Sequence, residues 1–363
     1  MDHPKRLLSL SAGLPKFRVD QFLLTHLPNI RYLCGFTGSA GVLLVGDGEP
    51  IFFTDGRYTA QANEEVRGAR ILIERMSPLA AAAEWIRRKR GGRWLGIEGD
   101  HMSVAAQGRL RAAVPKTLRI RPLSGAVERL RMTKDPAEIA LLRKAVDLGS
   151  ALFVPLLKTI RPGVAETTVA AKLEYAARTS GAEGMAFGTI VAAGQRSALP
   201  HGRASDSPIP RRGFVVLDFG VILAGYCSDM TRTVAVGRAS VKERGWYAAV
   251  LEAQLAGIAA VKPGATAGDI DHAARKVLKR SKLAKYFTHS TGHGVGLEIH
   301  ESPRLASGEK EILEPGMVIT IEPGIYVSGQ GGVRIEDMVL VTNTGCEVLT
   351  PTTKELITIS ANA

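Results

Sequence analysis

Five ionisable residues in the second half of the chain lie inside short apolar or glycine-rich segments, an unusual setting for a charge. They are Asp218 in VVLDFG, Asp229 in YCSDMTRT, His293 in TGHGVG, Glu322 in ITIEPG and Glu336 in GVRIED. Burying an unpaired carboxylate in such a strand-like run costs several kcal/mol or forces it to stay protonated. Four carboxylates and one imidazole in these places predict a cationic group among them. Two divalent metal ions would balance the four negative charges.

Asp218 and Asp229 are predicted to lie side by side on a β-hairpin. The segments FVVLDFGVIL and YCSDMTRTVAVG are typical of strands, and Ala224 and Gly225 lie near the midpoint between the two aspartates. An odd separation across a hairpin with an even loop puts both side chains on one face, within about 4.5–8 Å. Two carboxylates at this distance can share a pair of cations.

The histidines of the same half are clustered. His289, His293 and His300 are three of only eight in the chain. Gly292 and Gly294 flank the central one, which allows close backbone approach and disfavours a regular helix there. A single histidine is usually structural, but a cluster of three favours a functional site.

Glu322, Arg334 and Glu336 complete the set. Glu322 ends the strand-like run MVITIE, and strand ends are where functional residues often concentrate. Arg334 and Glu336 are two residues apart, so we expect them to share one face of a strand. The guanidinium of Arg334 could hold a ligand carboxylate through two hydrogen bonds, or it could form a structural salt bridge.

One imidazole and four carboxylates form a hard, oxygen-rich donor set. It favours two Mn(II) or Co(II) ions, with Zn(II) as an alternative, over metals that thiolates select. Two such ions about 3.5 Å apart would hold a bridging hydroxide, lower its pKa and polarise a scissile carbonyl. The remaining histidines would then bind substrate or transfer protons.

The chain of 363 residues is long enough for two domains. Residues 1–130 alternate strand-like and helical segments, including a helix over 79–90, which predicts a small α/β domain with a mixed or parallel sheet. Near the boundary, Asp135, Pro136 and Glu138 form the start signal of a long helix, expected to end at the Pro–Gly pair 162–163.

Residues 131–363 are predicted to form a second domain with a weak internal repeat. The Pro–Gly pairs 162–163 and 263–264 are each followed by an Ala-rich helix and then by strand-like segments with candidate ligands. Two related halves packed about a pseudo-twofold axis would place a site between them.

Composition narrows the function further. No apolar run approaches the roughly 18 residues that span a bilayer, and no secretion signal is evident, so a cytoplasmic protein without membrane contact is expected. Cys34, Cys227 and Cys346 show no metal or disulfide spacing, which fits reduced thiols. The net charge of +12 comes with basic runs at 87–93 and 278–285, but neither carries a nucleic-acid motif, so no specific nucleic-acid partner is expected.

At its ionisable residues the chain resembles the pita-bread metallopeptidases, the family of methionine aminopeptidase, aminopeptidase P and prolidase. The order Asp, Asp, His, Glu, Glu matches, including the 11-residue spacing of the aspartates. NIRYLCGFTGSAGVLLV and FFTDGRY resemble the N-terminal domain of the proline-specific members. The resemblance implies an α/β (α+β) fold, with a small N-terminal creatinase-like domain and a C-terminal pita-bread domain.

The resemblance also implies roles at the metal site. Asp229 and Glu336 would bridge the two ions, Asp218 would complete the shell of one, and His293 with Glu322 would complete the other.

The substrate side is implied in the same way. His201 in ALPHGRAS matches the substrate-side histidine of the family, His289 and His300 match two histidines lining the site, and Arg334 matches its arginine. Glu322 is expected to carry the proton from the water to the leaving prolyl nitrogen.

The favoured function is an Xaa-Pro aminopeptidase that acts on short proline-containing peptides, with a homodimer expected by resemblance. An Xaa-Pro amide has no N–H and a fixed φ, so its recognition needs a dedicated pocket. The alternative is a prolidase, an Xaa-Pro dipeptidase, which must recognise the free carboxylate of proline. Metal-free creatinase-like hydrolases and non-catalytic binding relatives lose ligands, whereas this chain keeps all five.

Overall fold

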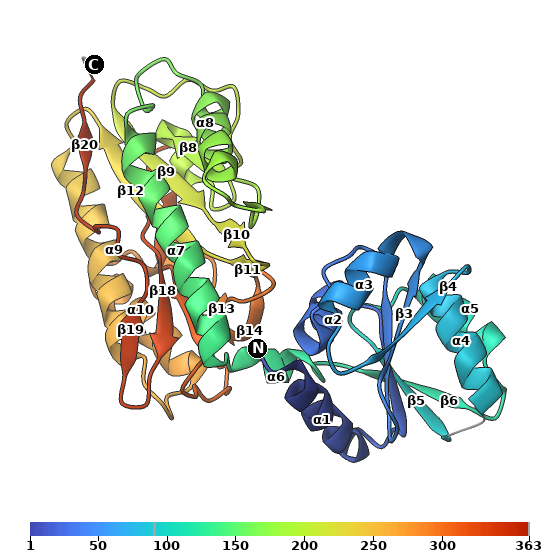
Figure 1. Ribbon diagram of the computed structural model, residues 1–363. Helices are drawn as coiled ribbons and strands as arrows, with labels where there is room; N and C mark the ends of the chain where they lie inside the picture. The colour runs from blue at the N-terminus through green and yellow to red at the C-terminus, as the bar shows by residue number, and fades with distance from the viewer. Residues whose placement is uncertain (90–91, 362–363) are drawn as a thin grey trace. The chain divides into compact units, whose positions relative to one another are not determined.

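The computed structural model describes residues 1–89 and 92–361 (Figure 1). The chain divides into two compact units, Met1–Arg131 and Met132–Ala363, which are described separately below. Two predictions reach positions outside the described residues. The helix expected over 79–90 ends at Arg90, and the basic run at 87–93 includes Arg90 and Gly91. None of the described helices is long and apolar enough to cross a membrane.

A six-stranded mixed sheet with the order β4-β3-β2-β1-β5-β6 organises the first unit. Strand β2 runs antiparallel to both of its neighbours, and the other adjacent pairs are parallel. The mixed sheet predicted for this half is therefore confirmed. The strands are β1 (Gln21–Leu24), β2 (Val42–Val45), β3 (Ile51–Asp55), β4 (Arg70–Glu74), β5 (Trp94–Glu98) and β6 (Arg119–Leu123).

Helices cover both faces of this sheet, with α2 and α3 on the side opposite α4 and α5 (Figure 1). Because side chains alternate along a strand, Leu23 of β1 packs in the cluster that includes Ile86 of α4 and Leu110 of α5, whereas Phe22 is buried on the other face. The helices are α1 (His3–Gly13), α2 (Leu27–Cys34), α3 (Thr59–Glu65), α4 (Pro78–Lys89), α5 (Val104–Ala113) and α6 (Glu128–Met132), with 3-10 turns η1 (Leu14–Phe17) and η2 (Gly56–Tyr58).

Two larger sheets form the centre of the second unit, with the orders β20-β12-β9-β8 and β14-β13-β15-β18-β19. Smaller pairings join β11-β10-β7 and β16-β17. The strands that matter for the site are nearly all buried. The strands are β7 (Gly184–Met185), β8 (Ile190–Ala193), β9 (Gly213–Phe219), β10 (Val221–Leu223), β11 (Tyr226–Cys227), β12 (Met230–Val236), β13 (Gly292–Gly294), β14 (Glu301–Leu305), β15 (Val318–Ile321), β16 (Gly324–Val327), β17 (Gly331–Arg334), β18 (Asp337–Val341), β19 (Cys346–Val348) and β20 (Thr358–Ile359).

Long helices flank these sheets (Figure 1). They are α7 (Pro136–Leu157), α8 (Glu166–Thr179), α9 (Val241–Ala260) and α10 (Ala267–Arg280), with 3-10 turns η3 (Gly194–Ala198) and η4 (Ala284–Tyr286). Helix α7 begins with the predicted capping box, in which the Asp135 side chain accepts from the Glu138 backbone and Glu138 accepts in return. Its predicted end was wrong, because the helix stops at Leu157. The backbone after Pro155 tightens into turns, where Lys158 N–H donates to the Pro155 carbonyl at 3.2 Å.

The predicted internal repeat is visible as two matching loop–helix units. Gly163 and Gly264 both adopt positive φ, +85° and +83°. The Gly163 N–H donates to the Ile209 carbonyl at 2.9 Å, and the Gly264 N–H donates to the Leu313 carbonyl at 3.0 Å. Helices α8 and α10 follow, and each half then contributes strands that carry candidate site residues. The fold thus brings segments far apart in sequence to one place.

Candidate active site

The five candidate metal ligands line one cavity of about 680 Å³ in the second unit. Asp218 lies in β9 and Asp229 just before β12, while His293 is the central residue of β13. Glu322 follows β15 directly, and Glu336 lies between β17 and β18. Contributions therefore come from both large sheets of this unit.

The predicted hairpin that carries the two aspartates is present. Strands β9 and β12 pair antiparallel with Asp218 opposite Thr231, so Asp229 is one diagonal step from Asp218. Ala224 and Gly225 form the turn between β10 and β11, with φ of +48° and +80°. A turn with both central residues at positive φ suits a tight hairpin.

Arg334 and Glu336 were expected to share one strand, but they do not. Strand β17 ends at Arg334 and pairs with β16, whereas β18 begins at Asp337 and pairs with β15. Glu336 lies at this change of partner, where its backbone N–H donates to the Thr231 carbonyl at 3.1 Å. The spacing of two indicated a common face, but it could not reveal that the chain changes sheets between them.

His293 is held in a narrow space between β14 and β15. A Cβ at Gly292 would come within 1.9 Å of the Thr320 carbonyl oxygen, and one at Gly294 would come within 2.2 Å of the Ser302 carbonyl oxygen. No side chain fits at either position. The glycines therefore let β13 approach its neighbours while His293 alone projects towards the carboxylates.

The His293 ring has a defined tautomer. Its Nδ1 is 3.0 Å from the Gly294 carbonyl, which can only accept, so Nδ1 carries the proton. The lone pair of Nε2 then faces Asp229 Oδ2 at 3.6 Å and Glu322 Oε1 at 3.5 Å. Burial lowers the pKa of His293 to about 4, so the ring is neutral at physiological pH. A neutral imidazole with a free Nε2 is the form that binds metals.

The carboxylates crowd one another. Asp229, His293 and Glu336 each offer a donor atom within 4.8 Å of the other two. Burial, and then the negative charges of neighbouring carboxylates, raise the pKa of Asp229 and Glu336 well above the ordinary range. Burial raises the pKa of Glu322 to about 8, although the charge of Arg334 opposes the shift. Without bound cations, some of these groups must hold protons.

The donor set fits divalent metal ions. Asp218 Oδ1 is buried and has no hydrogen-bond partner, an uncommon state for a carboxylate oxygen. The other oxygen, Oδ2, is paired with the Arg334 guanidinium. An unsatisfied oxygen beside a crowded group of acids and a free imidazole lone pair offers the donor atoms that divalent metal ions take.

A chain of hydrogen bonds joins Arg334, the partner of Asp218, to Tyr326 and His289. Arg334 Nη1 donates to the Tyr326 hydroxyl at 2.6 Å, and the hydroxyl lies 2.8 Å from His289 Nε2. His289 Nδ1 is 2.8 Å from the Ser290 carbonyl, so Nδ1 carries the proton and Nε2 accepts from the tyrosine. Burial lowers the pKa of His289 to about 3, which keeps this ring neutral. Tyr326 was missed from the sequence, although it follows Glu322 by four residues in IEPGIYV.

The cavity lining also includes His201 and His300, the histidines predicted for the substrate side, together with the apolar side chains of Phe187 and Ile190. The rings of His293 and His300 meet edge to face, with centroids 4.4 Å apart. The cavity lining thus combines ionisable and apolar side chains.

Two further arginines line this cavity and were missed from the sequence. Arg203 follows His201 by two residues, and Arg304 follows His300 by four. Even spacings such as these place side chains on one face of an extended chain, which was the available signal, although His201 and Arg203 lie at a turn in which the Arg203 N–H donates to the His201 carbonyl at 2.9 Å.

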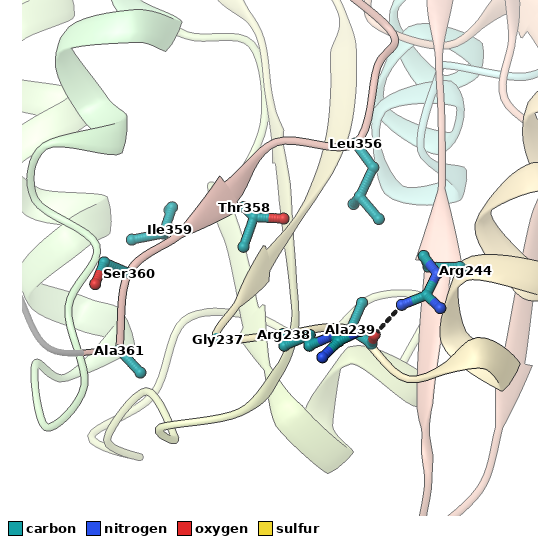
Figure 2. Close-up of a pocket in the computed structure, with 9 residues that line it drawn as sticks. All are labelled: Gly237, Arg238, Ala239, Arg244, Leu356, Thr358, Ile359, Ser360 and Ala361. Carbon is teal, nitrogen blue, oxygen red and sulfur yellow. Dashed lines mark hydrogen bonds between the residues drawn. The ribbon is translucent and has the colours of Figure 1, made fainter.

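A second, more open hollow of about 360 Å³ lies between β20 and the start of α9 (Figure 2). Among the described residues, its lining includes no Asp, Glu or His, and Arg244 Nη1 donates to the Ala239 carbonyl at 2.5 Å. It has no groups for acid–base or metal chemistry, so the cavity around Asp218 and His293 is the candidate active site.

Solved structures and curated proteins resemble the chain over nearly its whole length. An Xaa-Pro dipeptidase from Bacillus anthracis is 42% identical with a TM-score of 0.96, covering 99% of this chain and 100% of that one. An Xaa-Pro dipeptidase from Pyrococcus horikoshii is 38% identical, covering 95% of this chain and 96% of that one. An X-Pro aminopeptidase from Thermotoga maritima is 33% identical with a TM-score of 0.88, covering 98% of this chain and 100% of that one.

Comparison with protein families gives the same result for each half. Residues 6–133 match the creatinase/prolidase N-terminal domain, and residues 140–343 match metallopeptidase family M24. The pita-bread fold expected from the sequence is confirmed. The chain belongs to metallopeptidase family M24.

Proposed function

We propose that this chain is an Xaa-Pro dipeptidase, which hydrolyses the bond before proline in dipeptides. Two of the relatives named above are Xaa-Pro dipeptidases, at 42% and 38% identity. The X-Pro aminopeptidase relative, at 33%, supports the activity that the sequence alone favoured, which is now the second candidate.

The observation that carries the proposal is a pair of unpartnered cations in the cavity. Arg203 and Arg304 are both exposed to it, and within the described part of the chain neither guanidinium forms an ion pair or hydrogen bond. A dipeptide brings a free carboxylate close to the scissile bond, whereas a longer peptide has a neutral amide there. Arginine binds a carboxylate through two charge-assisted hydrogen bonds. Two arginines that have no anionic partner among the described residues therefore favour a dipeptide as the substrate.

Asp218, Asp229, His293, Glu322 and Glu336 would hold two divalent ions. Such ions supply an activated water and polarise the scissile carbonyl.

Side chains of the cavity would transfer the proton, hold Asp218 in place and border the bound peptide. Glu322, with a pKa of about 8, can hold or release a proton near neutral pH, which suits proton transfer to the prolyl nitrogen. Arg334 fixes Asp218 through its ion pair. His201 and His300 border the space in which the peptide would lie.

The proposal is tested by comparing three substrates after the chelator-treated protein is reloaded with Mn(II), Co(II) or Zn(II). Ala-Pro, its C-terminal amide and Ala-Pro-Ala share the scissile bond, but only the first has a carboxylate on the proline. We expect kcat/KM for Ala-Pro to exceed that for the amide by at least about tenfold. Losing one charge-assisted hydrogen bond costs about 1.5–3 kcal/mol, which corresponds to roughly 10–150-fold.

Arg304→Met should raise KM for Ala-Pro within that range and leave the amide unchanged. Arg238→Met is the matched control, because Arg238 is also exposed and unpartnered among the described residues but lines the other hollow. Preference for Ala-Pro-Ala would support the aminopeptidase instead. No cleavage with any of the three metals would indicate a non-catalytic relative.

A further inference from the structure

A fully buried carboxylate lies directly beside Glu336 and is not part of the cavity lining. Asp337, the first residue of β18, accepts from three donors. Arg232 Nη2 donates to Oδ1 at 2.7 Å, and Gln254 Nε2 and Lys354 Nζ donate to Oδ2 at 2.7 and 2.5 Å. The carboxylate is thus fixed from β12, α9 and the C-terminal segment together.

Arg232 is the largest fully buried side chain of the described chain. Besides Asp337, it donates to four backbone carbonyls. Nη1 donates to Thr231 O at 2.9 Å and to Glu336 O at 2.5 Å. Nη2 donates to Thr352 O at 2.6 Å, and Nε donates to Thr353 O at 2.8 Å. One guanidinium therefore joins β12, the junction before β18 and the C-terminal segment.

This guanidinium acts at the backbone of residues that carry the site. Asp229 and Thr231 share one side of the chain entering β12, and Arg232 points to the other. The Thr231 hydroxyl donates to Glu336 Oε2 at 2.6 Å. Holding the Thr231 and Glu336 carbonyls together therefore sets where the Glu336 carboxylate lies relative to Asp229.

Stability of the fold alone does not explain why the ion pair of Arg232 and Asp337 is buried. A buried ion pair seldom stabilises a fold more than well-packed apolar residues of the same volume, because both charges lose their hydration. A binding site, in contrast, needs its ligands held within about half an ångström, and partners behind the ligands do this.

We infer that Arg232 and Asp337 are positioning residues for the metal centre, and that Lys354 ties the C-terminal segment to the same group. The inference rests on the metal site of the proposed function. Neither Arg232 nor Asp337 lines the cavity, so both act through the backbone of Glu336 and its neighbours.

The test measures Mn(II) binding to the chelator-stripped protein by isothermal titration calorimetry, with thermal unfolding measured on the same samples. Arg232→Lys keeps the positive charge but loses the planar guanidinium with its five N–H donors. Asp337→Asn keeps the shape of the side chain but loses the negative charge. Lys354→Met removes a partly exposed donor and is the variant most certain to fold. Leu173→Ala, in the core beside α8, is the control for lost stability away from the site.

Arg232→Lys and Asp337→Asn should weaken Mn(II) binding by about 10–100-fold, as expected for residues behind metal ligands. Lys354→Met should weaken it less, and Leu173→Ala should lower only the Tm. KM for Ala-Pro should stay near the wild-type value while kcat falls at limiting metal. Mn(II) affinity within twofold of wild type in the first three variants, with only the Tm reduced, would overturn the inference. A wild-type protein that binds two Mn(II) ions but cleaves Ala-Pro with none of Mn(II), Co(II) and Zn(II) would overturn the proposed function alone.

Discussion

Neighbouring backbone groups decide which ring nitrogen carries the proton in two histidines of the cavity. The ring nitrogens of His289 and His293 are both assigned by carbonyl groups one residue further along the chain. The sequence was sufficient to predict that these histidines lie near the carboxylates. It could not predict their tautomers, because those depend on local backbone geometry, or the link through Tyr326, because that requires two strands to be placed. The metal-ligand roles themselves stay predictions.

Tyr326→Phe should remove the donor to His289 Nε2 and one of the two acceptors of Arg334 Nη1, which keeps its hydrogen bond to the Pro200 carbonyl at 3.0 Å. We expect the free energy of unfolding to fall by about 1–3 kcal/mol, the cost of unsatisfied buried groups. Tyr247→Phe is the control, because within residues 1–89 and 92–361 the Tyr247 hydroxyl has one partner, the Lys354 carbonyl at 2.9 Å, so the loss should be smaller. Urea denaturation measures the free energy of unfolding of both variants. An equal loss in the two would contradict the role given to the hydrogen bonds of Tyr326 with Arg334 and His289.

At the scale of elements, strand identity was easier to predict than strand partners. The β9–β12 hairpin followed from residue spacing alone, since the partners are close in sequence. The separation of β17 from β18 did not, because two residues of extended chain give no sign of a change of sheet. The end of α7 was misplaced for a similar reason: Pro155 lies inside the last turn, and the sequence offered the later Pro–Gly pair as the clearer stop.

Glycine substitutions test how tightly β13 is enclosed. Gly292→Ala should lower the free energy of unfolding by several kcal/mol and displace His293, because the added Cβ would lie 1.9 Å from the Thr320 carbonyl oxygen. Gly245→Ala in α9 should instead raise it by about 0.5–1 kcal/mol, since nothing lies within 4 Å and alanine favours helix. Chemical denaturation measures both, and a neutral Gly292→Ala would show that β14 and β15 can separate.

For the molecule as a whole, the internal repeat explains why residues scattered over more than a hundred positions meet. Asp218 and Asp229 belong to the first loop–helix–strand half, and His293, Glu322 and Glu336 to the second. The two Pro–Gly loops made this arrangement predictable in outline. Distances across the halves were not predictable, because they are set by how both sheets pack. The Arg232 group, which joins the halves behind the site, was equally invisible in sequence.

Metal removal should reverse the pH dependence of stability. In the metal-free protein the pKa of Glu322 is about 8 against an ordinary value of 4.5, and those of Asp229 and Glu336 are also raised. The folded state therefore holds protons that the unfolded state has already released above about pH 6. Between about pH 7 and about pH 8, each carboxyl that is protonated only in the folded state lowers the free energy of unfolding by about 1.4 kcal/mol per pH unit, and the contribution of Glu322 levels off above pH 8 because the buried group then ionises. His289 and His293 are neutral in both states over this range and contribute little.

The metal-loaded protein should behave in the opposite way. Bound ions require ionised carboxylates, so protons compete with them and the stabilisation from binding is lost as pH falls below about 7. Urea denaturation at several pH values, with EDTA or with saturating Mn(II), compares the two forms. Glu322→Gln should flatten the metal-free profile, because it removes one group that must ionise. If the curves with EDTA and with Mn(II) run parallel across this range, the crowded carboxylates are not where the cations bind.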